Sequence, residues 1–357
     1  MLTLVVEDDP ITRFIQVVLD PRTDAERRAA FADFVAHDVP DFAAWCERVR
    51  ARAPHLNPAA VRLVSTQEEL ADNIASAHAL VVESLEVGAA AIAGAPRLKA
   101  VQKFGVVLRN IDAAACAAKG IRVLTLRRRA NIATAEHAFA LMLMLARRTH
   151  EFSGVISAEQ LAAAGLPYRP FDRRHAPNGN WGRVPGLRSL HGSTIGIIGL
   201  GEIGREIALR AAAFGMHIRY FQRTRLSESE ERSLQAHYAE LDTLLAQSDW
   251  IVPQLPASPQ TRHFLDAGRL AKLKPGACIV NVARADLIER AALIQALASG
   301  RLGGFALDPL YEAPGRSDDE LLRFKNVILV PHLGGSPRWN AMNDCEELIV
   351  GLERALA

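Results

Sequence analysis

A glycine-rich turn at 199–204, GLGEIG, constrains the fold more than any other part of the chain. The apolar run Thr194–Ile198 before it predicts a strand, and an alanine-rich helical run follows it. A second extended run, His217–Phe221, comes after the helix. A strand, a tight turn, a helix and a strand of this size form one βαβ unit, which predicts an α/β fold with a doubly wound parallel sheet.

Each glycine of the turn has a mechanical reason. Gly199 lets the chain turn sharply, Gly201 lets the backbone approach a pyrophosphate, and Gly204 lets the helix pack close to the sheet. The N–H groups at the helix start, at Glu202 and Ile203, would face the phosphates. We therefore expect a dinucleotide-binding site here, with a purely structural turn as the alternative.

The residue that closes the second strand bears on the choice of cofactor. An Asp or Glu there would bind the ribose 2′-hydroxyl and repel a 2′-phosphate. This chain has Gln222 instead, followed by Arg223, Thr224 and Arg225. A neutral amide beside two cations suits a phosphorylated ribose, so NADP(H) is the expected cofactor. The open alternative is a solvated basic turn that also accepts NAD.

The length of 357 residues predicts two domains. The formal net charge of +2 gives no field that favours nucleic acid or a membrane surface. The four cysteines lack CxxC or Cys/His spacing, which argues against a zinc site or any other metal site and fits a reducing compartment. No segment is long enough for an export signal or a membrane span, so we expect a cytoplasmic protein.

The first part of the chain alternates short apolar runs with helical stretches, which predicts a parallel sheet covered on both faces. A run at 15–19 is a further candidate strand. The long helix at 131–148 is apolar on most sides and must be buried. Its exceptions, Glu136 and His137, are interpreted as residues near the helix start, with a catalytic role as the alternative.

The second domain begins with the glycine turn, after an irregular connection at 165–191 that is rich in Pro, Gly and Arg. Ligands of doubly wound sheets bind beyond the carboxyl ends of the strands. Arg284, Asp308 and His332 each follow a predicted strand directly. A last helix, at 337–356, is expected to pack on the first domain.

Arg284 and His332 suit one kind of chemistry when they face a nicotinamide. An arginine can hold a carboxylate or polarise a 2-oxo group through paired hydrogen bonds. A histidine can donate a proton to the oxygen as hydride reaches the carbon, and it acts as the base in the reverse reaction. Together with the glycine turn, they favour a hydride-transfer site over two separate structural roles.

Several motifs resemble the D-isomer-specific 2-hydroxyacid dehydrogenase family, which includes glyoxylate/hydroxypyruvate reductases, phosphoglycerate dehydrogenases and formate dehydrogenases. They are LPASPQTRHFLDAGRLAKLKPGACIVNVARADLIERAALIQALASGRLGGFALDPLYEAP and NVILVPHLGGSP. The resemblance covers the chain from about Leu98 onward. It implies a flavodoxin-like substrate domain at 1–153 plus 334–357, a Rossmann cofactor domain inserted at 154–333, and a homodimer.

The resemblance also implies residue roles. Arg284 is then the substrate-binding arginine, Asp308 an acid on the cofactor side, and His332 the proton donor. The further residues expected to contact the cofactor are Leu255, Pro256, Val282, Ala283, Gly334 and Gly335.

This chain departs from the family pattern beside the histidine. The acid that partners the histidine usually precedes the proline of a DVFxxEP-like segment directly, but Ala313 stands there and Glu312 comes one residue early. Either Glu312 still reaches His332, which we expect, or the histidine lacks its acid.

A second departure lies in the loop expected to bind the substrate carboxylate. The family commonly has a GxGxD-like run, whereas this chain has Gly105, Val106, Val107 and then Arg109. Arg127-Arg128-Arg129 replaces the usual neutral turn. These arginines either are exposed to solvent on the surface or bind a second anionic group on a larger substrate.

We therefore expect an oxidoreductase that transfers a hydride between NADP(H) and a 2-oxo acid or D-2-hydroxy acid. Arg284 orients the substrate, His332 passes the proton and Glu312 supports His332. Two alternatives stay open: a non-catalytic protein that senses nicotinamide cofactors on the same fold, and an NAD-dependent dehydrogenase of a non-standard small acid such as formate.

Overall fold

The computed structural model describes all residues from 1 to 357, and the chain divides into two compact units. Unit 1 contains 1–133 and 335–357, and unit 2 contains 134–334. The first crossing between units lies inside a long helix, earlier than the expected boundary after residue 153. The reason is that the later part of this helix packs into the core of unit 2.

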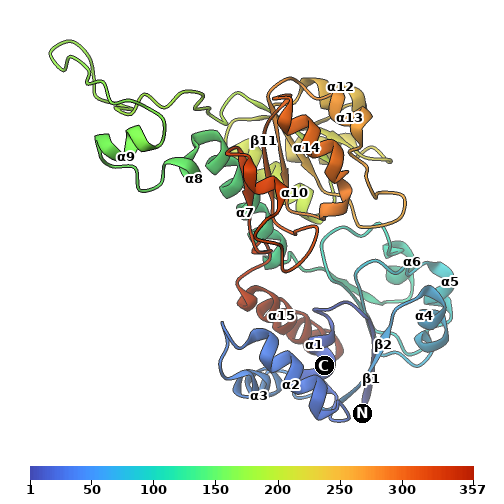
Figure 1. The fold of residues 1–357 in the computed structure, drawn as a ribbon. Helices are drawn as coiled ribbons and strands as arrows, with labels where there is room; N and C mark the ends of the chain where they lie inside the picture. The colour runs from blue at the N-terminus through green and yellow to red at the C-terminus, as the bar shows by residue number, and fades with distance from the viewer. The chain divides into compact units, whose positions relative to one another are not determined.

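Unit 1 contains a five-stranded parallel sheet with helices on both faces (Figure 1). Its strand order, β2-β1-β3-β4-β5, is the flavodoxin-like doubly wound order. The strands are β1 Leu2–Glu7, β2 Ala59–Val64, β3 Ala79–Val82, β4 Ala100–Lys103 and β5 Arg122–Leu124. The helices are α1 Arg13–Leu19, α2 Ala25–Val35, α3 Phe42–Ala51, α4 Gln67–Ile74, α5 Ala89–Ala93, α6 Ala113–Ala118 and α15 Arg338–Leu356.

Side chains of β1 alternate between two cores on opposite faces of this sheet. Leu4 and Val6 join the core formed with α1, α2, α3 and α15, whereas Val5 joins the core formed with α4, α5 and α6. Strands buried on both faces read as continuous apolar runs, as the sequence of β1 does. Met342 of α15 is fully buried in the first of these cores, so both chain ends build unit 1.

The candidate strand at 15–19 is wrong, because this run belongs to helix α1. Thr12 fixes the turn before the helix: its hydroxyl accepts the N–H of Asp9 at 3.2 Å. Phe14, Ile15 and the other apolar side chains of α1 are then buried together. A short apolar run alone does not distinguish a buried strand from a buried helix.

Unit 2 contains a seven-stranded parallel sheet. Its order, β12-β11-β10-β9-β6-β7-β8, is the Rossmann order with one more strand at the β12 edge. The strands are β6 Thr194–Ile198, β7 His217–Phe221, β8 Ala236–Tyr238, β9 Trp250–Pro253, β10 Ala277–Asn281, β11 Leu302–Leu307 and β12 Val327–Leu329. The helices are α7 Arg129–Arg147, whose first turn belongs to unit 1, then α8 Thr149–Phe152, α9 Ala158–Ala163, α10 Glu202–Ala213, α11 Glu228–Leu234, α12 Leu241–Gln247, α13 Ala267–Ala271 and α14 Arg290–Ala298, with 3-10 turns at Ala285–Leu287 and Glu320–Arg323.

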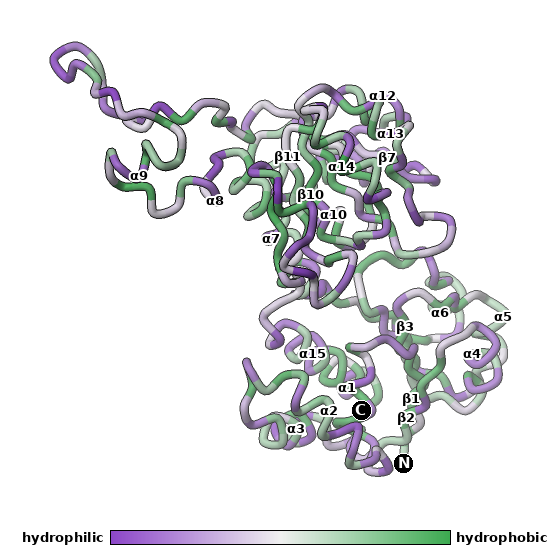
Figure 2. Tube along the Cα trace, viewed as in Figure 1, coloured by the Kyte–Doolittle hydropathy of each residue, from purple (hydrophilic) through white to green (hydrophobic).

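Helix α7 is largely green in the hydropathy view of Figure 2. Ala135, Ala138 and Met142 are fully buried in one core of unit 2, together with residues of α10 and of the sheet. The predicted burial of this apolar helix is confirmed. None of the helices combines the length and apolar composition needed to cross a bilayer.

The connection at 165–191 has no helix or strand, as its composition predicts. It is held by a few contacts of its own: Tyr168 meets Trp181 edge to face at 5.9 Å, and the Arg183 guanidinium lies 3.9 Å from the Phe171 ring centre. The polar part of this segment is purple in Figure 2.

Candidate functional site

The three glycines of the turn between β6 and α10 meet different surroundings. A Cβ on Gly199, whose φ is 102°, would lie 2.5 Å from the Gln254 carbonyl oxygen, and one on Gly204 would lie 2.3 Å from the Gly199 carbonyl oxygen. The chain's own packing therefore requires these two glycines. A Cβ on Gly201 would meet nothing within 4 Å, so the open side of the turn is here, at the N-terminus of α10. This open backbone before a helix fits a pyrophosphate.

Glu202 and Ile203 form the first turn of α10, as expected. A helix N-terminus favours negative charge through its unpaired N–H groups and its dipole. The residues present thus fit the dinucleotide that the sequence predicts.

Gln222, directly after β7, ties the end of this strand to the glycine turn. Its Oε1 accepts the N–H of Leu200 at 3.2 Å, and its Nε2 donates to the Thr224 carbonyl at 2.6 Å. Arg225 forms a two-fold ion pair with Glu231, with N–O distances of 2.8 and 2.9 Å.

Arg223 is the second cation expected at this strand end. It is exposed and forms no ion pair. Arg225 is held by an acid of its own chain, so Arg223 is the cation available to a ligand at this position.

The turn after β10 presents Arg284. Asn281, fully buried at the end of the strand, accepts the N–H of Ala283 at 3.0 Å and donates to the Arg284 carbonyl at 2.7 Å. Arg284 is exposed, and its guanidinium donates only to the neighbouring Ala283 carbonyl, at 2.7 Å. Val282 and Ala283 are buried, so their backbone rather than their side chains can face a ligand.

Sequence reasoning did not single out Asn281. An asparagine between a buried strand and a turn was the available signal, since its side chain can replace backbone partners. Leu255 and Pro256, expected on the cofactor side, follow β9 at the same edge of the parallel sheet.

Asp308, directly after β11, is almost fully buried, with 1% exposure. Its Oδ1 accepts the N–H of Leu333 at 2.6 Å, and its Oδ2 accepts the N–H of Gly334 at 3.1 Å. His137 Nε2 lies 3.2 Å from Oδ1, but its geometry is not that of an aligned hydrogen bond, so this contact is electrostatic. Burial alone would raise the pKa of Asp308, but His137 and the two N–H groups hold it below its ordinary value.

His137 and Glu136 therefore correct one expectation. Helix α7 begins at Arg129, so both residues lie well inside it rather than near its start. Glu136 pairs with Arg210 at 3.0 Å. The contact of His137 with Asp308 was not predicted, because the two residues are far apart in sequence.

His332 is exposed and has a left-handed backbone, with φ of 57°. Glu312 is also exposed, and no hydrogen bond or ion pair joins it to His332. The neighbouring Tyr311 is anchored through its hydroxyl to the Ile288 carbonyl at 2.9 Å, and Arg316 is the charged group near Glu312. The acid expected beside the histidine is therefore not in contact with it in this structure.

In unit 1, the loop expected to bind the substrate carboxylate follows β4. Gly105 has φ of 151°, which a side chain would disfavour. Val106 and Arg109 are exposed, and Val107 is partly exposed. The loop thus presents a cation, Arg109, to solvent.

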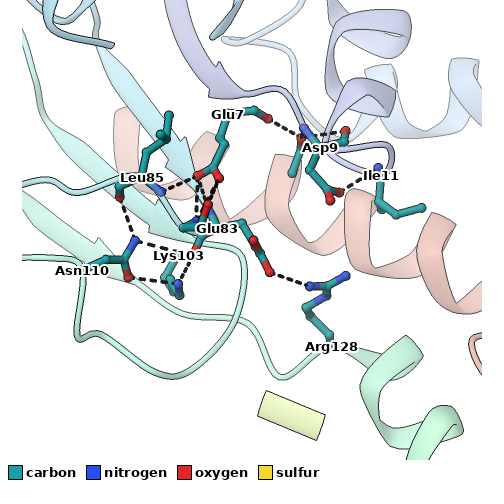
Figure 3. Close-up of polar contacts among 10 residues, drawn as sticks. Glu7, Asp9, Ile11, Glu83, Leu85, Lys103, Asn110 and Arg128 are labelled. Carbon is teal, nitrogen blue, oxygen red and sulfur yellow. Dashed lines mark hydrogen bonds and ion pairs between the residues drawn. The ribbon is translucent and has the colours of Figure 1, made fainter. Parts of the chain in front are cut away.

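The loop is braced by polar contacts among neighbouring strand ends (Figure 3). Buried Lys103 donates to the Glu83 carbonyl and to Asn110 Oδ1, the latter at 3.0 Å, and Asn110 donates to the Leu85 carbonyl at 2.8 Å. Arg128 lies 3.5 Å from a carboxylate oxygen of Glu83.

The expected basic run does not act as one unit. The Arg128 guanidinium lies 3.8 Å from the ring centre of Phe104. Arg129 binds Asp344 at 2.9 Å and Glu347 at 2.7 Å. Arg127 is exposed.

Comparisons with known proteins identify the family to which the chain is similar. Residues 139–334 match the family model for the NAD binding domain of the D-isomer specific 2-hydroxyacid dehydrogenases. A glyoxylate reductase from Pyrococcus furiosus is 34% identical over 284 residues, which cover 79% of this chain and 80% of that protein. A D-3-phosphoglycerate dehydrogenase from Methanocaldococcus jannaschii is 36% identical over 272 residues, which cover 76% of this chain and 48% of that protein.

A solved structure of a glyoxylate reductase from Paecilomyes thermophila is 25% identical and has a TM-score of 0.54, covering 99% of this chain and 95% of that chain. The predicted fold class, two parallel doubly wound sheets, is confirmed. With a family model that matches more than half of the chain and a relative that is 34% identical over most of it, the protein belongs to the D-isomer-specific 2-hydroxyacid dehydrogenases and is an NAD(P)-dependent oxidoreductase.

Proposed function

We propose that the protein reduces a 2-oxo acid to the D-2-hydroxy acid with NADPH, and catalyses the reverse oxidation with NADP. The observation that carries this proposal is that Arg284 and His332 are presented at the same edge of the unit 2 sheet. Both side chains are exposed, and both follow strands whose carboxyl ends lie at one edge of the unit 2 sheet, the edge of the open glycine turn. Ligands of such sheets bind at this edge.

In this proposal Arg284 binds the carboxylate and the 2-oxo group of the substrate by paired hydrogen bonds. Its guanidinium has no acid of its own to displace, since it donates only to a backbone carbonyl. The protonated imidazole of His332 gives its proton to the carbonyl oxygen, and in the reverse direction the neutral imidazole removes it. The bound nicotinamide supplies the hydride that reaches the same carbon.

The preference for NADP(H) rests on Gln222 and Arg223. No carboxylate stands at the end of β7 to repel a 2′-phosphate, and Arg223 is exposed beside it. Arg225 contributes less, because Glu231 already binds it. The double variant Gln222→Asp with Arg223→Ala should shift the ratio of kcat/KM values toward NADH. An unchanged ratio contradicts this assignment.

The substrate is proposed to be a small 2-oxo acid. Support comes from the relatives named glyoxylate reductase, at 34% identity in Pyrococcus furiosus. Exposed Arg109 favours a substrate that carries a second anionic group. A panel of 2-oxo acids with and without a second carboxylate, scored by NADPH oxidation, shows which of these two substrate classes the protein prefers.

A homodimer is part of the proposal. Leu143 of α7, Leu209 of α10 and the adjacent Phe214 are large apolar side chains that stay more than a third exposed in unit 2. If these side chains form one apolar patch, it would suit an interface. Light scattering should give twice the chain mass, and a monomer at micromolar concentration contradicts this part.

One observation favours a second candidate function, a nicotinamide-binding protein without catalysis. Glu312 does not contact His332, so the histidine lacks a side-chain acid. An NAD-dependent dehydrogenase of a small acid such as formate has no comparable support. Purified protein that binds NADPH and oxidises none with any member of the 2-oxo acid panel would favour the binding protein.

The direct test of the enzyme is Arg284→Ala. We expect turnover to fall by roughly a thousand-fold, because a charge-assisted bidentate contact to the reacting group is lost. NADPH affinity should stay within about three-fold, since the glycine turn is untouched. A variant that loses cofactor binding as well would make Arg284 a structural residue.

A further inference from the structure

Three successive backbone N–H groups bind to one residue at the edge of the unit 2 sheet. His332 donates to the Asp308 carbonyl at 3.1 Å, Leu333 donates to its Oδ1 at 2.6 Å, and Gly334 donates to its Oδ2 at 3.1 Å. Asp308 thus holds the histidine's own backbone and the two residues after it.

The histidine needs such a restraint. Its φ of 57° is a left-handed conformation, which is unfavourable for a non-glycine residue. Such conformations persist where the surroundings fix them. The side chain of His332 makes no hydrogen bond, so the restraint acts through the backbone that Asp308 holds.

Gly334 shows how closely the carboxylate approaches. A Cβ at this position would lie 2.7 Å from Asp308 Oδ2 and 3.5 Å from Thr134 Cγ2. A larger residue would therefore displace the carboxylate or the turn. Glycine here is explained by the approach of the acid, without reference to a cofactor.

The imidazole of His137 lies against the acid. Its Nε2 lies 3.2 Å from Asp308 Oδ1, and its side chain is 18% exposed. With one contact from His137 and two from backbone N–H groups, the carboxylate has its polar partners inside the protein.

We propose that Asp308 is the positioning residue for His332: it fixes the backbone that orients the imidazole, and its contact with His137 helps to hold the carboxylate in place. The proposal rests on the proposed function, because it takes His332 as the proton donor. Misplacement of a reacting group by about 1 Å can cost a hundred-fold in rate.

The test is Asp308→Asn in the full-length protein. An amide keeps the shape of the carboxylate but places an NH2 group against one of two backbone N–H groups. We expect kcat at saturating NADPH to fall roughly ten- to a hundred-fold. Backbone N–H groups at 332–334 should exchange with deuterium faster than in the wild type.

Hydrogen exchange separates the two proposals, because it needs no substrate. If the wild type reduces no 2-oxo acid, the proposed function fails, and faster exchange at 332–334 in Asp308→Asn still supports the restraint. Unchanged exchange, or a loss of NADPH affinity at unchanged kcat, overturns the positioning role.

Asp344→Asn is the matched control. Asp344 is also a buried acid that accepts backbone N–H groups, at Arg129 and Ala130, and an arginine side chain. We expect no change of exchange at 332–334 in this variant. If Asp308→Asn does not fold, Gly334→Ala decides, because its Cβ displaces the same carboxylate; unchanged exchange and kcat in that variant then overturn the proposal.

Discussion

Each unit of this protein uses one buried carboxylate to fix a loop at the carboxyl edge of its sheet. In unit 1, Glu7 at the end of β1 accepts the N–H groups of Glu83, Ser84 and Leu85 at 2.6–3.0 Å (Figure 3). In unit 2, Asp308 after β11 accepts those of the segment after β12. In both cases the acid stands at the end of one strand or directly after it, and it holds the segment after the neighbouring parallel strand.

The two loops differ in what they carry. The segment that Glu7 holds has an ordinary backbone, and its charged residue, Glu83, pairs with Arg128. The segment that Asp308 holds has a left-handed residue, and that residue is the exposed His332. A buried acid thus serves as a plain loop anchor in unit 1, and the same arrangement in unit 2 holds a residue with a left-handed backbone, the proposed proton donor.

The largest expected effect separates the residues that the two loops carry, His332 and Glu83. His332→Gln should lower kcat by about 10²–10⁴-fold, because proton transfer is lost. Glu83→Gln should change kcat by less than about five-fold, since its partner Arg128 stays anchored over Phe104. Steady-state kinetics with NADPH measure both. Equal losses would mean that Glu83 also acts on the substrate and would remove the contrast between the loops.

The second expectation concerns stability, where the two acids should behave alike. Glu7→Gln and Asp308→Asn each leave buried N–H groups without a good acceptor, which costs about 1–3 kcal/mol. We expect comparable losses in thermal denaturation. Only the unit 2 variant should lower kcat by ten-fold or more. A loss of kcat in Glu7→Gln of the same size would show that the effect of Asp308 is a general result of weakened folding.

A smaller effect concerns acid stability and compares Asp308 with Asp344. Burial is offset by hydrogen bonds at Asp308, whose pKa is lowered, whereas at Asp344 burial outweighs the bonds from Arg129, and the pKa is raised. A lowered pKa gives stability that is present above the unfolded-state value near 4 and is lost as pH falls through the folded-state value. A raised pKa gives stability that is present below the unfolded-state value and is lost as pH rises.

The two asparagine variants should therefore respond to pH in opposite ways. Asp308→Asn should cost more stability at pH 7 than at pH 3, and Asp344→Asn should cost more at pH 3 than at pH 7. Denaturation at the two pH values measures this. Two variants with the same pH trend would contradict the opposite pKa shifts.

The sequence predicts much of this fold because the βαβ signals are local. The bounds predicted for β6 and β7 agree with the structure, and the glycines between them are explained by close backbone contacts. The strand predicted at 15–19 was wrong, because a short apolar run looks the same in a buried helix and in a buried strand.

The site was harder to predict where it depends on partners distant in sequence. Arg284 and His332 follow strands, and parallel strands bring their ends to one edge, so their placement was predictable. The partners of Asp308 were not, since they come from α7 and from a turn whose backbone conformation has no sequence pattern. The position of Glu312 depends on a loop anchored by Tyr311, which the one-residue shift alone does not determine.

The smallest expected effect belongs to His137, which contacts Asp308 and which the sequence wrongly placed near the start of its helix. Its contact with Asp308 is electrostatic and partly solvated, so its loss should cost less than the loss of the carboxylate. We expect His137→Leu to lower kcat by about two- to five-fold and His137→Gln, which keeps a donor, by less. Unit 1 offers the reference, because Glu7 holds its loop with no cationic side chain among its hydrogen-bond partners. If His137→Leu lowers kcat as far as Asp308→Asn does, the contact with His137 rather than the backbone hydrogen bonds determines the position of His332, and the parallel between the two units does not extend to how they work.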